Sequence, residues 1–284
     1  MQIAVVGLGG IGSTFARQLS LAGHEVTVIA RNARLEQLQR DGAIVSVGGA
    51  RAPVKVSATL DAAIEYDLVL VTVLASQVDT VLPSLTASRA RTVMFMFNTF
   101  EPLTRLRDAV GAERFAFGFP SVIANIVEGG QLTSAIVTRG ALSPVTDAVW
   151  GKVFTDAGIP CFVEADMESW LRTHAAVVVP VMTVSVVAHA RKAGVSWAEA
   201  RQSARAMNEG FQLVRRLGHS LTPSAIAVFS HLPSFLVTTL LWVASRFNLF
   251  RKMGAVGPRE PRALIDEMSA VAPGQTLALL AIRP

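Results

Sequence analysis

A short apolar strand that runs straight into a glycine-rich turn opens this chain and constrains its fold more than any other feature. The turn is Gly7-Leu8-Gly9-Gly10-Ile11-Gly12, and a helical pattern follows it at once. In such a turn Gly7 permits the tight bend, Gly9 lets a pyrophosphate approach the backbone, and Gly12 lets the helix pack close to the strand. The N–H groups at the start of the helix then face the phosphates. The motif predicts a dinucleotide site; the alternative is a glycine-rich turn with a structural role only.

The end of the second predicted strand distinguishes between two dinucleotides. That strand is His24–Ala30, and it follows a helix expected over Ser13–Ala22. In an NAD enzyme such a strand usually ends in an acidic residue that holds the ribose 2′-hydroxyl. Here Arg31 takes that place and can pair with a 2′-phosphate, while Arg34, one turn further on, can add positive charge. We therefore expect NADPH/NADP⁺ as the cofactor; the alternative is that Arg31 is a solvated loop residue.

The length and composition indicate a two-domain protein with a large apolar core. The chain has 284 residues, of which 51% are hydrophobic and 17% are charged, and its mean hydropathy is +0.44. This hydropathy makes membrane insertion worth testing. However, the most apolar runs, Ala175–Ala188 and Leu232–Ala244, fall short of the ~18–20 uninterrupted apolar residues of a spanning helix. We therefore expect buried helices or a dimer interface, and no membrane.

The charge and the cysteine content narrow the class of partner and the compartment. The net charge is +5, but the basic residues lack the aromatic-interleaved stripe of a nucleic-acid-binding protein, and the excess suits small anionic ligands. The single Cys161 excludes an internal disulfide and a cysteine metal cluster, and it fits a reducing compartment. No secretory signal is expected, because the N-terminus is itself a strand. We expect a cytoplasmic protein that binds neither nucleic acid nor a metal.

The alternation of strands and helices changes near residue 165. Before that point, Asp67–Val73 and Arg91–Phe97 are near-continuous apolar runs, typical of central parallel strands covered on both faces. After Val163 the apolar residues recur at helical spacing. We predict an α/β fold, with a Rossmann-type doubly wound parallel sheet over residues 1–165 that binds NADP and an all-helical domain over residues 166–284 for substrate binding and dimerisation. Further expected elements are helices at Ser76–Leu85 and Leu103–Val110, strands at Arg114–Gly118 and Ser134–Thr138, and a helix that starts at Ser143-Pro144.

A polar residue that directly follows a buried strand is a candidate for ligand contact. Asn98 comes straight after the strand that ends at Phe97, and ligands of open α/β sheets lie outside the carboxyl ends of the strands. Its amide can both donate and accept at a nicotinamide or a substrate oxygen. The alternative is an Asx-turn that closes the strand. Ser121 and Asn125, in a loop expected over Gly118–Gly130, are weaker candidates of the same kind.

Several of these stretches together resemble the ketopantoate reductase (2-dehydropantoate 2-reductase) family. The glycine turn leads to GHEVTVIAR at 23–31, which ends in the family's NADPH-type arginine at Arg31. The segment LVTVLASQV at 70–78 is similar to the family's fourth strand, and DMESWLR at 166–172 is similar to the opening of its helical domain. The resemblance implies that Asn98 contacts cofactor and substrate and that Ala124 lines the cofactor. It covers most of the chain and becomes thin after about residue 200.

The chain departs from this family at charged and polar positions of the site. A lysine in the loop after the fourth strand corresponds to Leu74, and the catalytic lysine corresponds to Arg172. Two asparagines that line the substrate site correspond to Ala176 and Pro180. Glu260 matches a glutamate that touches ligand and cofactor. The resemblance thus implies cofactor contacts from Leu74 and Glu260, and a substrate site that has lost polar groups.

Reduction of a ketone needs a proton for the developing alkoxide, and these departures leave its donor open. Arg172 is a poor donor because its pKa stays above about 12, but it can hold a carboxylate or stabilise an oxyanion. His174 is chemically the better donor. It lies about 200° around a regular helix from Arg172, and core packing is its alternative role. Glu168, one turn before Arg172, is expected to pair with it. No role is assigned to His189, His219 or His231.

Two classes of function fit the sequence. The first is an NADPH-dependent oxidoreductase that reduces a small 2-oxo acid or related carbonyl, with Arg172, Asn98 and His174 as catalytic candidates. For this class the resemblance implies reduction of 2-dehydropantoate to pantoate in pantothenate biosynthesis, while the altered helix admits a different carbonyl. The second is a non-catalytic NADP(H)-binding protein that senses redox state. In either case the apolar helices favour a homodimer, unless they are all core of one domain.

Overall fold

The chain is divided between two units, and it passes from one to the other three times. Unit 1 comprises Met1–Phe97 and Leu103–Met167, and unit 2 comprises Asn98–Pro102 and Glu168–Pro284. The computed structural model describes residues 1–284, apart from the side chain of Val256. The five-residue segment Asn98–Pro102 lies inside the range expected for the first domain, yet its contacts assign it to unit 2.

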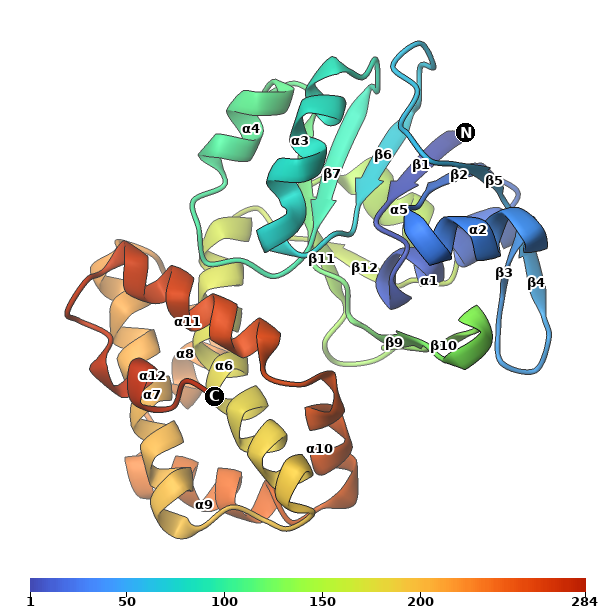
Figure 1. Cartoon of the computed structure of the whole chain (residues 1–284). Helices are drawn as coiled ribbons and strands as arrows, with labels where there is room; N and C mark the ends of the chain where they lie inside the picture. Colours follow the sequence, from blue (N-terminus) through green and yellow to red (C-terminus); the bar gives the residue numbers. More distant parts are fainter. The chain divides into compact units, whose positions relative to one another are not determined.

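An eight-stranded sheet forms the centre of unit 1 (Figure 1). Its strands are β1 (Gln2–Val6), β2 (Glu25–Ile29), β5 (Lys55–Ser57), β6 (Leu68–Val71), β7 (Thr92–Met96), β8 (Phe115–Gly118), β11 (Ser143–Val145) and β12 (Cys161–Val163). Their order is β12-β11-β8-β7-β6-β1-β2-β5, and each neighbouring pair is parallel except β8 and β11. Every residue of β6 is buried, because helices cover both faces of the sheet. The predicted doubly wound fold is confirmed.

Five α-helices belong to unit 1. They are α1 (Gly10–Leu21), α2 (Asn32–Asp41), α3 (Val78–Ala87), α4 (Thr104–Val110) and α5 (Ala148–Asp156), with the 3₁₀ turn η1 (Ala75–Gln77) before α3. Helices α1 and α5 share one face of the sheet, where the rings of Phe15 and Phe154 meet edge to face at 5.1 Å. Helices α3 and α4 cover the other face (Figure 1). The expected helices therefore exist, with small shifts of their ends.

The helix predicted to start at Ser143-Pro144 is wrong. These residues form β11, where the buried Ser143 hydroxyl accepts the N–H of Ser121 at 3.0 Å instead of capping a helix. Helix α5 begins at Ala148, and its cap is Asp147, whose carboxylate accepts the N–H groups of Val149 and Trp150. An aspartate at this position satisfies helix donors that would otherwise be unpaired, so the cap lies four residues further along the chain than predicted.

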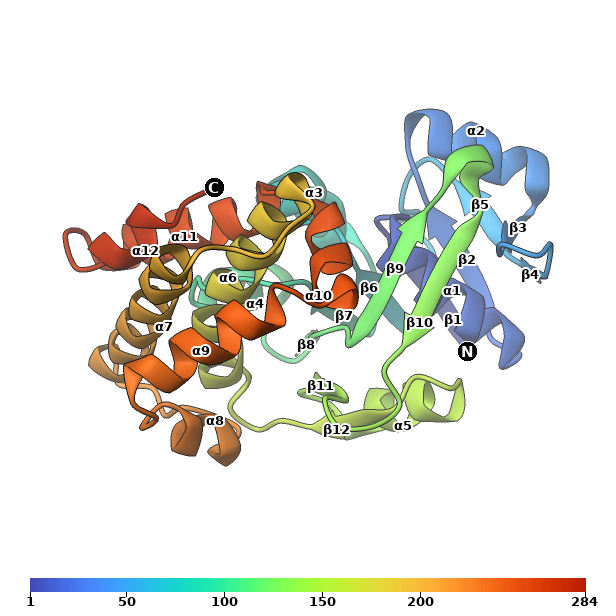
Figure 2. The same cartoon turned by 90° about the horizontal axis from the view of Figure 1, so that it is seen from below.

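Two hairpins lie outside the large sheet. One pairs β3 (Ala43–Val45) with β4 (Arg51–Pro53), and the other pairs β9 (Val122–Ile126) with β10 (Leu132–Ile136) across the turn η2 (Glu128–Gly130). The loop predicted over Gly118–Gly130 is therefore wrong for its central residues, which form β9 (Figure 2). Alternate residues of β9 pack on the core of unit 1 while Ile123 faces outward, which is the pattern of a half-covered strand.

Unit 2 is helical, as predicted. Its main elements are α6 (Met167–Arg191), α7 (Trp197–Arg216), α8 (Ser224–Phe229), α9 (Ser234–Ala244), α10 (Asn248–Met253), α11 (Arg259–Val271) and α12 (Leu277–Ala281), with the 3₁₀ turn η3 (Gly254–Val256). Ser196 caps α7 and Glu199 completes the capping box. Helix α9 packs along α7 (Figure 2). Among the described residues, α6 alone is long and apolar enough to cross a membrane, but most of its apolar window is buried, as in a core helix.

Candidate functional site

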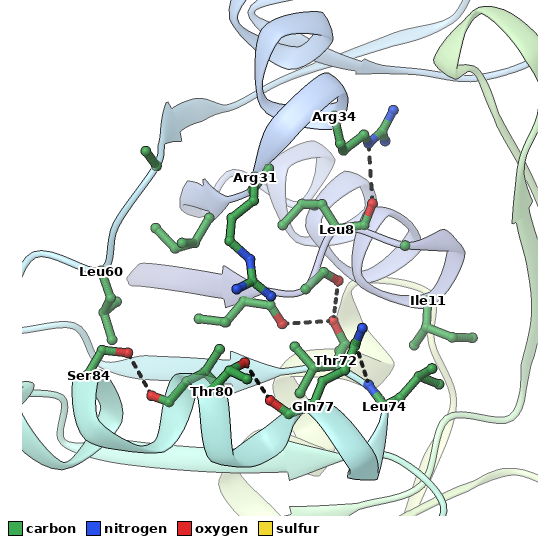
Figure 3. A pocket seen from close by; sticks show the side chains of 18 of the residues that line it. Leu8, Ile11, Arg31, Arg34, Leu60, Thr72, Leu74, Gln77, Thr80 and Ser84 are labelled. Atoms are coloured by element: carbon green, nitrogen blue, oxygen red, sulfur yellow. Dashed lines mark hydrogen bonds between the residues drawn. The ribbon is translucent and has the colours of Figure 1, made fainter. Parts of the chain in front are cut away.

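A cavity of about 590 Å³ opens at the carboxyl ends of β1, β2 and β6 (Figure 3). The strand order reverses here, because the chain runs outward from β1 through β2 to β5 and then resumes at β6. In open α/β sheets this switch point is where ligands bind. The cavity is lined by residues 6–11, which include most of the glycine turn, by Ile29–Arg31 and Arg34, by Ala58–Leu60, by Thr72–Leu74 and by one face of α3 with the Gln77 that precedes it.

The glycines of the turn are required by its geometry. Gly7 has φ +99°, and a Cβ there would lie 2.8 Å from the backbone nitrogen of Val73. A Cβ on Gly12 would collide with the Gly7 carbonyl. At Gly9, in contrast, a Cβ would meet no atom within 4 Å, so the space in front of this residue is open. A pyrophosphate can therefore approach the backbone at Gly9, while Gly7 and Gly12 pack closely against the neighbouring backbone on the protein side of the turn.

The carbonyls of the turn are held by donors from other segments. The hydroxyl of Thr72 donates to the Gly7 oxygen at 2.7 Å, and Nε of Arg34 donates to the Leu8 oxygen at 3.2 Å. Ala124, in β9, lies directly against Gly10, where a Cβ would collide with the Ala124 carbonyl. Ala124 thus supports the turn from the side, and it is absent from the described lining of the cavity.

Arg31 and Leu74 mark the rim of the cavity. Arg31 is exposed at the N-terminus of α2, and its side chain points into the cavity (Figure 3). No acidic residue is among the described residues of the lining, so nothing in the wall repels a phosphate. Leu74 is 53% exposed at the end of the β6 loop. Arg31 and Arg34 therefore supply the positive charge of this wall without a lysine at position 74.

The wall formed by α3 was missed by the sequence reasoning. Gln77, Thr80, Val81 and Ser84 line the cavity at the spacing of one helix face. The Thr80 and Ser84 hydroxyls donate to carbonyls of their own helix, at 2.7 Å each, and Gln77 accepts the N–H of Leu74 at 3.4 Å. These polar groups are therefore already paired. The face could have been found from the helical repeat of small polar residues behind a predicted strand end.

Asn98 and Glu260 come together in unit 2. The Asn98 amide donates to the Glu260 carboxylate at 3.2 Å, while the Asn98 Oδ1 atom is buried without a hydrogen-bond partner among the described residues. Further along the segment, the Thr99 hydroxyl and the Phe100 N–H donate to Glu267 at 2.9 and 2.7 Å. Burial raises the pKa of Glu267, and the hydrogen bonds from Phe100 and Thr99 partly offset the rise. Helix α11 thus holds the segment that begins at Asn98 through two carboxylates, Glu260 at Asn98 and Glu267 at Thr99 and Phe100.

Arg172 lies at the centre of a buried polar cluster in α6. Its guanidinium donates to Glu168 at 2.7 Å and contacts Nε2 of His219, whose Nδ1 is 2.9 Å from the Ser169 hydroxyl. The guanidinium also stands 5.5 Å above the ring of Phe100. The pairing expected between Glu168 and Arg172 is confirmed. His219, to which the sequence reasoning assigned no role, is a member of this cluster.

His174 occupies different surroundings from Arg172. Its ring stacks on Trp170, with centroids 4.9 Å apart and planes 9° from parallel. Burial lowers the pKa of His174 to about 4, so the imidazole is neutral near pH 7. On the same helix, Ala176 is fully buried and faces α7, since a Cβ on Gly210 would lie 2.9 Å from the Ala176 Cβ. This helix face is therefore packed core at the position where an asparagine was implied.

No three or more His, Cys, Asp or Glu side chains in the described part of the chain are placed to hold a metal ion. In unit 2 the carboxylates of Glu260, Glu267 and Glu168 are instead hydrogen-bonded to an amide, a hydroxyl and a guanidinium.

Comparison with known proteins identifies relatives of the chain. The model of a family described as ketopantoate reductase PanE/ApbA matches residues 3–140. The chain is similar to the ketopantoate reductase of Ralstonia eutropha, with a TM-score of 0.74 at 17% identity over 100% of this chain and 97% of that one. It is also similar to a D-mandelate dehydrogenase in complex with NADH (0.72, 15%, 100% and 97%) and to a dimeric ketopantoate reductase from Staphylococcus aureus (0.68, 13%, 100% and 96%). At these identities the likeness shows a shared fold. No curated protein matches the sequence.

Proposed function

We propose, from the match of residues 3–140 to the ketopantoate reductase family, that this chain is an NADPH-dependent reductase of a small 2-oxo acid or related carbonyl. The observation that carries the proposal is the acid-free cavity at the glycine turn, into which Arg31 points. A nicotinamide cofactor bound there supplies the hydride. 2-Dehydropantoate, with pantoate as product in pantothenate biosynthesis, is the first substrate to test.

The preference for NADPH over NADH rests on Arg31. Its exposed guanidinium follows β2, where an NAD enzyme carries an acid for the ribose hydroxyls, and it can pair with a 2′-phosphate. One relative, a D-mandelate dehydrogenase, was solved with NADH, so the fold alone does not decide between the two dinucleotides. The proposed preference for NADPH over NADH therefore depends on the positive charge of Arg31 at the rim of the cavity.

For the substrate we assign stabilisation of the developing oxyanion to Arg172, and to Asn98 a hydrogen bond with a donor group of the cofactor or the substrate. Asn98 has its Nδ2 on Glu260 and a buried Oδ1 that is without a partner among the described residues, so its amide is oriented and retains an acceptor. Arg172 keeps a buried positive charge that can stabilise an oxyanion. His174, being neutral near pH 7, is a weaker proton donor than its type suggests. Ala176 and Pro180 are buried and supply no polar group in place of the two implied asparagines, so carbonyls other than 2-dehydropantoate are further substrates to test.

A second candidate function is a non-catalytic NADP(H)-binding protein that senses redox state. The observation that favours it is the engagement of Arg172 by Glu168 and His219 at the position of the family's catalytic lysine. Such an arrangement supports the fold of α6 without requiring a substrate. Both functions use the same cavity and the same cofactor.

We further propose a cytoplasmic homodimer that binds neither nucleic acid nor a membrane nor a metal. The outer surface of α9 supports the dimer: Phe235, Leu236, Leu240 and Val243 are 62, 37, 53 and 40% exposed. We call these four residues the α9 face. Residues 232–245 include no charged side chain, and interface cores are depleted of charge. A second copy presents the same uncharged face, so no like charges meet at its centre.

Two measurements test the proposal. Fluorescence titration should give tighter binding of NADPH than of NADH, and equal affinity would contradict the role of Arg31. Oxidation of NADPH, followed by absorbance, should then respond to one or more members of a panel of 2-oxo acids and aldehydes, with 2-dehydropantoate included. Tight NADPH binding without turnover of any carbonyl would favour the sensor over the enzyme.

A further inference from the structure

Arg34 binds the glycine turn from behind. It lies in the first turn of α2, and its Nε donates to the Leu8 oxygen at 3.2 Å. Its Nη2 donates at 2.8 Å to the hydroxyl of Ser13, which follows the turn in α1. One guanidinium thus holds both the middle of the turn and the start of the helix that follows it. Figure 3 shows its bond to Leu8.

The same guanidinium reaches a third segment. Its Nη1 donates at 2.7 Å to the oxygen of Gly130, in η2 at the tip of the β9–β10 hairpin. This hairpin carries Ala124, whose carbonyl lies against Gly10 of the turn. Arg34 therefore fixes the hairpin and the turn to each other across 96 residues of sequence. A single side chain links α2, the turn and the hairpin that supports it.

The charge of Arg34 is retained in this position. Its acceptors are the Leu8 and Gly130 carbonyls, the Ser13 hydroxyl and the Gln37 amide, all of which are neutral. Burial lowers the pKa of Arg34, with Asp41 acting in the opposite direction, but an arginine stays protonated at neutral pH. Because Arg34 also lines the cavity, its positive charge is felt where phosphates would sit.

We propose that Arg34 is a positioning residue for the pyrophosphate. By holding the Leu8 carbonyl it keeps the turn oriented so that its N–H groups face the cavity, and it adds positive potential behind them. The inference rests on the proposed function, in which this cavity binds a nicotinamide dinucleotide. Since the pyrophosphate is common to NADPH and NADH, Arg34 supports both cofactors equally, whereas Arg31 acts on the 2′-phosphate of NADPH alone.

The test compares dissociation constants for NADPH and NADH, by fluorescence titration, across a set of variants. Arg34→Ala should raise both constants by a similar factor of about ten, the size expected for one lost charged hydrogen bond. Arg34→Lys, which keeps the charge, should restore more binding than Arg34→Gln, which keeps a donor only. Arg31→Ala should raise the constant for NADPH and leave that for NADH. Arg40→Ala removes an exposed charge from the last turn of the same helix and should change neither.

Three outcomes would overturn the inference. Loss of NADPH binding alone in Arg34→Ala would make Arg34 a 2′-phosphate ligand. Unchanged binding of both cofactors would show that the turn needs no such support. Equal behaviour of the Lys and Gln variants would remove the charge from the argument. Wild-type protein that binds neither dinucleotide would instead overturn the proposed function, and thermal unfolding of each variant without cofactor checks that it is folded.

Discussion

At the scale of single residues, the His174 imidazole links stability to pH. Its pKa is about 4 in the folded protein because burial disfavours the charged ring, against 6.5 for an ordinary histidine. The unfolded chain therefore takes up a proton more readily than the folded one between these two values. Stability contributed by the neutral ring is complete above pH 6.5 and is lost as the pH falls toward 4. A change of this size corresponds to roughly 3 kcal/mol.

His174→Phe should remove this dependence while keeping an aromatic ring against Trp170. We expect the free energy of unfolding of the variant, measured in urea, to fall less between pH 7 and pH 4.5 than that of the wild type. Carboxylates that titrate in the same range are common to both proteins and cancel in the difference. Parallel curves for the two proteins would contradict the burial of a neutral imidazole.

Residue roles could be predicted where they depend on neighbours in the sequence. The pairing of Glu168 with Arg172 follows from one helical turn, and the glycine turn follows from its own spacing. His219 joins Arg172 from 47 residues away, and Arg34 meets Gly130 from 96 residues away. Nothing local to either residue points to such a partner, because the contact exists only once the helices and the hairpin are packed.

At the scale of elements, helix α11 anchors the segment Asn98–Pro102. One carboxylate oxygen of Glu267 accepts both the Thr99 hydroxyl and the Phe100 N–H. Burial raises the pKa of Glu267, so its charged form is disfavoured in the folded state. For a carboxyl with a raised pKa, this stability is present at low pH and is lost as the pH rises through the folded value. Glu267 thus accepts two favourable hydrogen bonds, but burial of its negative charge is unfavourable.

Glu267→Gln keeps an acceptor oxygen without the charge, whereas Glu267→Ala leaves two donors unpaired. We expect the Gln variant to be at least as stable as the wild type at pH 7 and the Ala variant to be less stable than Gln by about 1–3 kcal/mol. Urea unfolding at pH 7 measures the difference. If the Ala and Gln variants unfold at the same urea concentration, the segment is held by other contacts.

Elements with a strong repeat were predictable, and short ones at sheet edges were not. The buried strands β6 and β7 stand out as apolar runs because both of their faces are covered. β9 was taken for part of a loop because it is short and lies beside glycines, and β11 was taken for a helix start because of its proline. The partner of β11 is β12, which follows only after a whole helix, whereas β9 pairs with the nearby β10 and was hidden by the glycines around the turn between them.

At the scale of the whole molecule, the α9 face predicts assembly. Light scattering of the wild type should give twice the chain mass of 30.2 kDa. Leu240→Asp places a charge in the centre of the α9 face and should give the monomer mass, because two buried like charges would oppose each other. Leu21→Asp is the matched control, since Leu21 in α1 is equally exposed at 55% and lies outside the α9 face. A monomeric wild type that binds lipid vesicles would assign the α9 face to a membrane instead.

The fold class of the whole molecule could be predicted because it depends on periodicity, which every segment carries. Strands and helices alternate up to β12, and helical spacing follows from α6 onward. The membership of Asn98–Pro102 in unit 2 could not be predicted, because it depends on Glu260 and Glu267 more than 150 residues later. The hydrogen bond between Asn98 and Glu260 could not be predicted from a local pattern for the same reason, because the two residues are 162 positions apart.

The threefold passage of the chain between its units constrains how the protein can be recombined. A chimera that joins residues 1–167 of this chain to the helical part of a relative has one breakpoint, but it separates Asn98, Thr99 and Phe100 from Glu260 and Glu267. A functional exchange needs breakpoints on both sides of Asn98–Pro102 as well, so that the segment travels with its helix. In natural recombination as in engineering, Asn98–Pro102 must therefore be exchanged together with the distant gene segment that encodes α11.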